Sequence, residues 1–270
     1  MTSYSTFPDL TPEQKELRAL YEGLKIEFSE LFALKNEMLS HQAPFLTSLY
    51  LELIGRKLYE VYCLRVELSK LKQQMTLLQA YVNRNETPDV MSVYKKIEHQ
   101  FAEYQKKIEE EAQQLAAARE YLKGSFLTDD ESKELKTMYY TIVKRLHPDI
   151  NPDLTDEQKE LFVKAQAAYE LLDINTLRLI ILSLDLGKTD APKAYALAEM
   201  VAKLTENIIT LKKQIDALKQ EFPHVFSEKL KDEDWVKKQQ ENADKEIENF
   251  KTEIEKYKQY VTLLEEWKPA

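Results

Sequence analysis

The sequence predicts an all-α protein in which a helical bundle and long antiparallel coiled-coil helices surround an inserted helical hairpin. Three observations support this prediction. Only 4 of 270 residues are glycine, against a usual share of about 7%, and β-sheet folds need glycine in their turns. Charged residues make up 31% and apolar residues 43% of the chain, a balance typical of long helices. The apolar residues also recur at alternating spacings of three and four, which is the heptad pattern.

Charge and cysteine content narrow the possible partners and the compartment. The formal net charge is −9, which disfavours binding to the phosphate backbone of nucleic acids. Cys63 is the single cysteine and has no second cysteine with which to form an internal disulfide. The first residues lack the basic and apolar regions of a signal peptide, and no apolar run approaches the ~18 residues of a membrane span. We therefore expect a cytoplasmic protein without nucleic-acid or membrane partners.

Capping residues mark where the helices begin. A Thr or Asp side chain at the first turn accepts a hydrogen bond from a free backbone N–H, and a Pro or a Glu/Gln nearby strengthens the signal. Breaks at proline imply two further starts, near Pro44 and Ser227. The direct signals are found at Thr11-Pro12, Thr87-Pro88-Asp89, Thr128 with Glu131, Thr155 with Gln158, and Asp190.

The apolar spacing between these starts predicts how the helices pair. Heptad seams run through 90–122, 197–222 and 243–264. The segment 45–82 is apolar on nearly all sides, so it is expected inside a bundle. Short connections at 41–44 and 83–88 predict that 12–40 and 89–122 are its antiparallel neighbours. For the same reason, 192–222 and 227–267 are expected to form an antiparallel hairpin.

A shorter passage between the long helices carries a distinctive loop. Apolar residues at helical spacing predict one helix that ends at about Leu146 and a second that restarts at Thr155. Pro148 and Pro152 disfavour helical geometry at the residues before them, so the loop is expected to be extended. This arrangement predicts a hairpin that displays His147, Pro148 and Asp149 at its tip.

This passage resembles the J-domain (DnaJ-type) co-chaperone family, whose signature is a His-Pro-Asp tripeptide between two antiparallel helices. The resemblance covers about 120–173, with 120–124 similar to the family's first helix. Two positions before the histidine that are often basic in the family are Tyr140 and Thr141 here, and the low glycine and cysteine counts leave no room for a Gly/Phe-rich linker or a cysteine-rich zinc module. The family's motif positions are matched by Leu135, Tyr139, Ile142, Arg145, the tripeptide, Asn151-Pro152, Phe162 and 168–172.

The resemblance implies a co-chaperone that docks on a DnaK-type chaperone ATPase and stimulates its ATP hydrolysis. The long coiled-coil helices would select the client protein or the cellular location of the co-chaperone. The coiled coils could also join copies of the chain into homo-oligomers. The implied domains are 1–119, 120–186 and 187–270. No cofactor, metal or enzymatic activity of the chain itself is expected. The implied partner-binding residues are His147, Pro148, Asp149, Lys136, Lys144, Arg145 and Asn151.

There are two alternatives to this function. The first is a coiled-coil interaction scaffold in which the J-like segment is only a structural joint. The second is a calcium loop, because oxygen-bearing side chains follow the EF-hand spacing from Asp149 to Glu160. Leu154 occupies the position at which an EF-hand loop needs glycine, and Thr155 is better placed as a helix cap. We therefore expect no calcium site.

Overall fold

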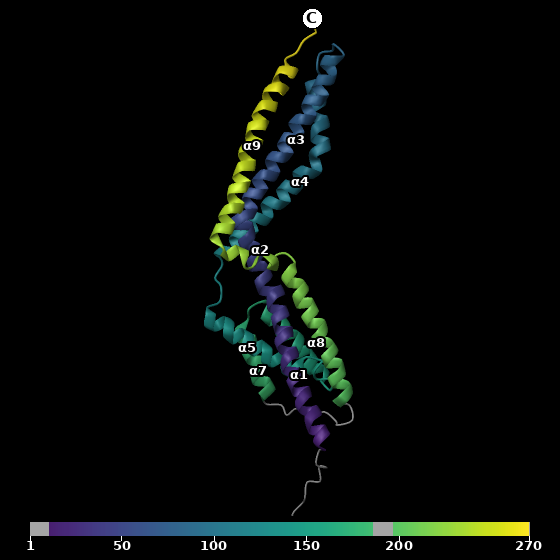
Figure 1. The fold of residues 1–270 in the computed structure, drawn as a ribbon, viewed down its shortest axis with the longest axis vertical. Coiled ribbons are helices and arrows are strands. Elements are labelled where there is room, and N and C mark those ends of the chain that lie inside the picture. Colours follow the sequence, from purple (N-terminus) through teal and green to yellow (C-terminus); the bar gives the residue numbers. More distant parts are fainter. Residues whose placement is uncertain (1–10, 186–196, 270) are drawn as a thin grey trace, which may run out of the picture. The chain divides into compact units, whose positions relative to one another are not determined.

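A computed structural model describes residues 11–185 and 197–269, and every regular element within these ranges is a helix (Figure 1). This confirms the all-α prediction. The chain divides into two compact units: unit 1 comprises Met1–Pro44 and Ser125–Val225, and unit 2 comprises Phe45–Gly124 and Phe226–Ala270. Among the described helices, none is long and apolar enough to cross a membrane.

The first part of the described chain is helical without interruption from Pro12 to Asn83. The short connection predicted at 41–44 is therefore wrong, and so is the antiparallel pairing of 12–40 with 45–82. Pro44 lies two residues after the end of a π-helical turn, where the regular ladder of hydrogen bonds is already altered, so its missing N–H does not end the helix. The consecutive elements are α1 (Pro12–Glu37), η1 (Met38–Gln42), α2 (Ala43–Tyr50), η2 (Leu51–Gly55) and α3 (Arg56–Asn83).

Unit 2 is built on α3, with α4 (Val90–Lys123) and α9 (Glu233–Glu265) packed against it. A short turn at 84–89 makes α4 antiparallel to α3, as predicted. Asn85 adopts the left-handed conformation in this turn, with φ of 56°, which asparagine tolerates better than most residues. Helix α9 runs parallel to α3, because the ion pairs Glu60–Lys251 and Glu67–Lys258 advance in the same direction along both helices.

Helix α8 (Leu197–Gln220) packs against α1 in unit 1 (Figure 1). Its buried seam residues Leu204, Ile208 and Leu211 share one apolar cluster with Tyr21 and Phe28 of α1. The predicted hairpin between 192–222 and 227–267 is therefore wrong: α1 covers the seam of α8, and α3 covers that of α9. Two 3-10 turns replace the expected tight connection, and they lie at His224–Phe226 and Lys229–Lys231.

The observed units also differ from the predicted succession of three domains, because each unit combines two distant stretches of chain. The physical reason is that each C-terminal helix pairs with a segment from the first third of the chain. The predicted start at Ser227 is also displaced, since α9 begins after Asp232, whose carboxylate accepts a hydrogen bond from Trp235 N at 3.1 Å. Asp190, another predicted start, lies outside the described residues.

The predicted hairpin forms in unit 1. Capping boxes at Thr128 and Thr155 start its two helices, as predicted. After the second helix, Leu172 turns the chain in the left-handed conformation and Asp173 caps the next helix through Thr176 N at 3.0 Å. The three helices are α5 (Asp129–Leu146), α6 (Asp156–Glu170) and α7 (Ile174–Asp185).

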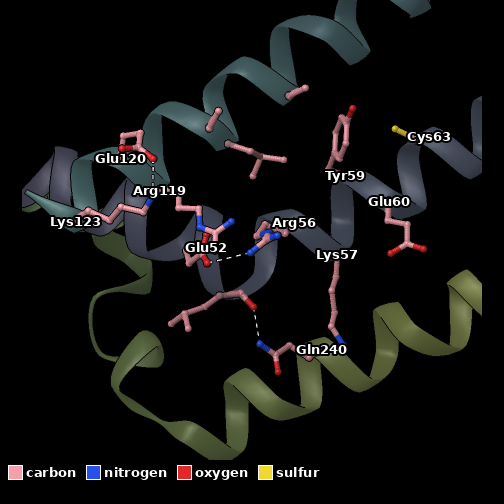
Figure 2. Close-up of a pocket in the computed structure, with 14 residues that line it drawn as sticks. Glu52, Arg56, Lys57, Tyr59, Glu60, Cys63, Arg119, Glu120, Lys123 and Gln240 are labelled. Carbon is pink, nitrogen blue, oxygen red and sulfur yellow. Dashed lines mark hydrogen bonds and ion pairs between the residues drawn. The ribbon is translucent and has the colours of Figure 1, made fainter.

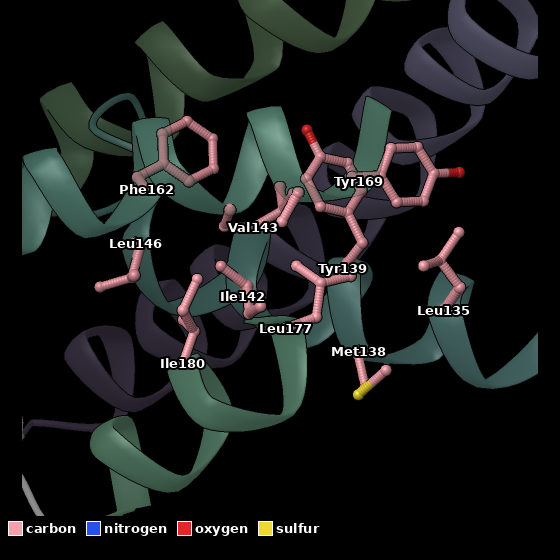
Figure 3. Close-up of a cluster of buried hydrophobic side chains, with 12 residues drawn as sticks. Leu135, Met138, Tyr139, Ile142, Val143, Leu146, Phe162, Tyr169, Leu177 and Ile180 are labelled. Carbon is pink, nitrogen blue, oxygen red and sulfur yellow. The ribbon is translucent and has the colours of Figure 1, made fainter. Parts of the chain in front are cut away.

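One apolar core joins α5, α6 and α7 (Figure 3). Within it the rings of Tyr139 and Tyr169 stack with centroids 4.0 Å apart and planes 12° from parallel. Both side chains are almost fully buried, and burial raises the pKa of Tyr139 to about 12. This core fixes the loop between α5 and α6 at one end of the hairpin.

Candidate functional site: the loop between α5 and α6

The loop that carries the His-Pro-Asp tripeptide is held by its own hydrogen bonds. His147 leaves the helix with extended backbone angles, as expected for a residue before proline. Its Nδ1 accepts a hydrogen bond from Asp149 N at 3.1 Å. The amide of Asn151 donates to Lys144 O at 3.1 Å and to His147 O at 3.3 Å. Asn151 therefore shapes the loop by closing it onto the last turn of α5.

His147 is buried, which differs from the sequence expectation that the tip displays it. Its ring is 8% exposed, whereas Pro148 and Asp149 are exposed. Three aromatic rings meet the imidazole edge-on, with centroid distances of 4.8 Å to Phe28, 4.4 Å to Phe32 and 5.2 Å to Phe162. Two of these rings come from α1, a helix that the local sequence pattern does not connect with the loop.

The surroundings of His147 favour its neutral form. Burial lowers the pKa of the imidazole to about 4, and the opposing attraction of the Asp149 carboxylate is smaller. The ring is therefore uncharged at neutral pH. An uncharged imidazole is also the form that suits an aromatic surrounding without a paired carboxylate.

Side chains from α1 and α8 hold the other loop residues. The Tyr21 hydroxyl donates to Ile150 O at 2.7 Å, and Lys25 Nζ donates to Asn151 Oδ1 at 3.0 Å. From α8, Asn207 Nδ2 donates to Asp149 Oδ2 at 3.1 Å. These contacts were missed in the sequence, because nothing in the local spacing links residues so far apart along the chain.

The basic residues predicted to bind a partner occupy two parts of α5. Lys144 and Arg145 lie in its last turn, next to the loop, where positive charge also suits the negative end of the helix dipole. Lys136 lies two turns earlier and forms an ion pair with Glu37 of α1 at 2.7 Å. The structure thus brings Lys144 and Arg145 close to the tripeptide, and it engages Lys136 with α1.

Three of the oxygen-bearing side chains of the alternative calcium loop have other partners. Thr155 Oγ1 accepts from Gln158 N at 3.3 Å as the cap of α6. Asn151 Oδ1 and Asp149 Oδ2 accept from Lys25 and Asn207. Across the described ranges, no three His, Cys, Asp or Glu side chains are grouped so that they could hold a metal ion.

A groove of about 870 Å³ lies in unit 2, between α3, α4 and α9 (Figure 2). Most of its charged lining residues are paired within the unit: Arg56 with Glu52 at 3.1 Å, Lys123 with Glu120 at 2.6 Å, and Lys57 with Asp244. Cys63 lines the same groove. Because these charges neutralise one another, the groove offers no concentrated charge for a ligand.

The segment expected to act as the first helix of the J-like fold belongs to the other compact unit. Residues 120–123 are the end of α4 and belong to unit 2. Helices α1 and α7 pack against α5 instead. The segment 120–123 thus ends a helix that packs against α3 within unit 2.

Comparison with known proteins gives one match. Neither the curated proteins nor the solved structures include a match to this chain. A family model described as the DnaJ domain matches residues 127–180, a partial segment that runs from the residue before the Thr128 cap into α7. The match contains His147, Pro148 and Asp149, so the resemblance to the J-domain family is confirmed over residues 127–180 of a longer helical chain.

Proposed function

We propose that the protein is a J-domain-type co-chaperone that docks on a DnaK-type chaperone ATPase and stimulates its ATP hydrolysis. The observation that carries this proposal is the His-Pro-Asp loop between α5 and α6, inside the segment that matches the DnaJ domain. The nucleotide would be bound and hydrolysed by the partner. The chain itself would supply only the surface that promotes the reaction.

Each predicted site residue has a role in this proposal. Pro148 and Asp149 are exposed and would contact the partner directly. Lys144 and Arg145 would add positive charge beside them, which accelerates association with an acidic surface. The predicted partner-binding roles of His147, Asn151 and Lys136 remain part of the proposal: His147 and Asn151 would fix the loop shape that the partner recognises, and Lys136 would extend the basic face.

Unit 2 would set the client or the cellular location. The long helices α3, α4 and α9 form an extended apolar core with charged outer faces. Surfaces of this kind suit binding to other helices, either in a client protein or in a second copy of the chain. Action in the cytoplasm is part of the same proposal.

A single-turnover ATPase assay tests the proposal. The full chain is added to the DnaK-type chaperone of its own organism with bound ATP, and wild type should accelerate hydrolysis. Asp149→Asn should reduce the acceleration at least tenfold, because it removes the exposed charge but keeps an oxygen that can accept from Asn207. Asp153→Asn is the matched control in the same loop and should retain the acceleration.

The burial of His147 favours one alternative, a scaffold in which the J-like segment is a structural joint. In that case wild type neither binds nor stimulates DnaK-type chaperones of the same cell. A pull-down would then recover the same partners with wild type and Asp149→Asn. This result would replace the co-chaperone proposal with the scaffold.

A further inference from the structure

The tripeptide loop lies where two packed groups of helices meet within unit 1. The core of α5, α6 and α7 forms one apolar cluster. Helices α1 and α8 form a second cluster, and Ile150, directly after the tripeptide, is the loop residue buried in it. Ile150 is only 1% exposed. The loop is therefore attached to α1 and α8 as well as to its own hairpin.

Polar contacts from α1 and α8 reach three consecutive loop residues. Asn207 binds the Asp149 carboxylate, Tyr21 binds the Ile150 carbonyl and Lys25 binds the Asn151 side chain. Phe28 and Phe32 of α1 cover the His147 ring. Two of the three tripeptide residues, His147 and Asp149, are thus engaged by the chain itself.

Helix α1 also lies along the face of α5 that carries Lys136. The ammonium of Lys136 pairs with Glu37, and Asn36 Nδ2 donates to the Tyr139 hydroxyl at 2.5 Å. Tyr140 lies one turn after Lys136 on the same face of α5. Burial raises the pKa of the Tyr140 hydroxyl, and the nearby Glu30 carboxylate of α1 raises it further. The acidic side chains of α1 therefore face the side of α5 that would attract an acidic partner.

We infer that α1 and α8 form an autoinhibitory cover that holds the tripeptide loop closed, and that the DnaK-type chaperone gains full access only when this pair moves off the hairpin. This inference rests on the proposed function. It adds a regulatory step: the loop exchanges between a closed form, seen here, and an open form that is competent to bind.

The packing allows such a movement without unfolding the hairpin. All the buried residues of the hairpin core come from α5, α6 and α7, and α1 adds only the partly buried Phe32 and Ala33 at its edge, so the three helices keep most of their apolar contacts when the cover leaves. Helices α1 and α8 are joined to each other by their apolar cluster and by Glu27–Lys212 at 2.6 Å and Lys35–Gln214 at 2.8 Å. The two helices can therefore move as a pair. An equilibrium of this kind reduces the apparent affinity for the partner by the fraction of molecules that are open.

The test uses the full chain and weakens the cover without changing the tripeptide. The variant combines Tyr21→Phe, which keeps the buried ring, with Asn207→Ala. The control is Lys212→Ala, which removes an ion pair between α1 and α8 but no contact with the loop. Two quantities are measured: amide hydrogen exchange of the peptide that contains 147–151, and the concentration of chain that gives half-maximal stimulation of the chaperone ATPase.

We expect the double variant to speed loop exchange by at least about fivefold, the effect of losing one ordinary hydrogen bond, and to lower the half-maximal concentration by a similar factor. The control should change neither quantity. Unchanged loop exchange in the double variant would overturn the inference, and so would faster exchange with stimulation equal to that of wild type. If no form of the chain binds or stimulates the chaperone, the proposed function fails and the inference falls with it. The two failures can be told apart, because wild type still stimulates the chaperone when only the inference is wrong.

Discussion

The hydroxyl of Tyr21 donates a 2.7 Å hydrogen bond to the carbonyl of Ile150, a residue 129 positions later in the chain. Both residues are almost completely buried. The bond satisfies a loop carbonyl that would otherwise be desolvated without a partner, which is costly in a protein interior. It also ties α1 to the residue directly after the tripeptide, so the stability of unit 1 and the conformation of the loop are coupled.

This coupling predicts that His147→Gln destabilises the protein. The substitution removes the ring contacts with Phe28, Phe32 and Phe162 and leaves a flexible amide in an apolar site. We expect a loss of about 2 kcal/mol in the free energy of unfolding, within the range of substitutions at packed sites. Chemical denaturation measures it, and Asp149→Asn, on an exposed residue, is the control. Equal midpoints for His147→Gln and wild type would contradict the burial of the ring.

The sequence predicted an exposed His147, whereas the structure buries it. The parts of the prediction that are correct rest on local signals. The caps at Thr128 and Thr155, the break at Pro148 and the apolar stripes are local signals, and they correctly predicted the hairpin and its loop. The aromatic cover from Phe28 and Phe32 depends on contacts across more than a hundred residues. No local periodicity reports such contacts.

The same distinction explains the errors in helix pairing. A heptad seam, such as the one through Leu204 and Ile208, indicates that a helix is buried along one side but not which helix covers it. The sequence prediction assigned α8 and α9 to each other because they are neighbours in the chain. The observed partners are α1 for α8 and α3 for α9. Both partners are distant in sequence, and they bury the heptad seams of α8 and α9.

The lowered pKa of His147 predicts that stability depends on pH. The folded form has a pKa of about 4, and the unfolded form has the ordinary value of about 6.5. Between these values the unfolded chain binds more protons, so stability falls as pH falls from 6.5 to 4. The full difference corresponds to about 3 kcal/mol, as an order of magnitude. The measurement is the free energy of unfolding at several pH values in this range.

The control for this prediction is His147→Gln, which cannot titrate. Burial also lowers the pKa of two other histidines, His41 and His224. They are common to both proteins, so the difference between wild type and variant isolates His147. A pH slope that is the same in both proteins would show that His147 is not the group responsible.

Tyr139→Phe tests the hydrogen bond between Asn36 of α1 and the Tyr139 hydroxyl of α5. The substitution keeps the stack with Tyr169 but leaves the Asn36 amide without its partner hydroxyl. We expect a loss of about 1 kcal/mol in the free energy of unfolding. Thermal denaturation compared with wild type measures the loss. A melting temperature above that of wild type would contradict the importance of the contact.

Calcium should not stabilise the protein. Leu154 occupies the position where an EF-hand loop needs glycine, and Thr155 Oγ1 already caps α6. Millimolar calcium should therefore shift the melting temperature no more than the same concentration of magnesium. A larger shift with calcium alone, lost in Asp153→Asn, would instead indicate a calcium site in the loop.

Charge reversal at Lys144 and Arg145 tests how the proposed partner associates. The residues follow one another in the last turn of α5, beside the tripeptide. Lys144→Glu with Arg145→Glu should raise the concentration needed for half-maximal ATPase stimulation by about tenfold at low salt. The difference should shrink at high salt, because exposed charges are screened over about 8 Å at physiological ionic strength and over shorter distances above it.

Two control variants separate weaker association with the partner from the effects of net charge and of helix stability. Lys237→Glu with Lys245→Glu changes the net charge equally on exposed residues of α9 in unit 2 and should leave stimulation unchanged. Because negative charge at a helix C-terminus opposes the dipole, Lys144→Gln with Arg145→Gln removes the positive charge with less strain on α5 and should show an intermediate effect. A loss that does not depend on salt, together with a lowered melting temperature, would mean that the basic pair stabilises α5. Such a result would remove these two residues from the proposed docking surface.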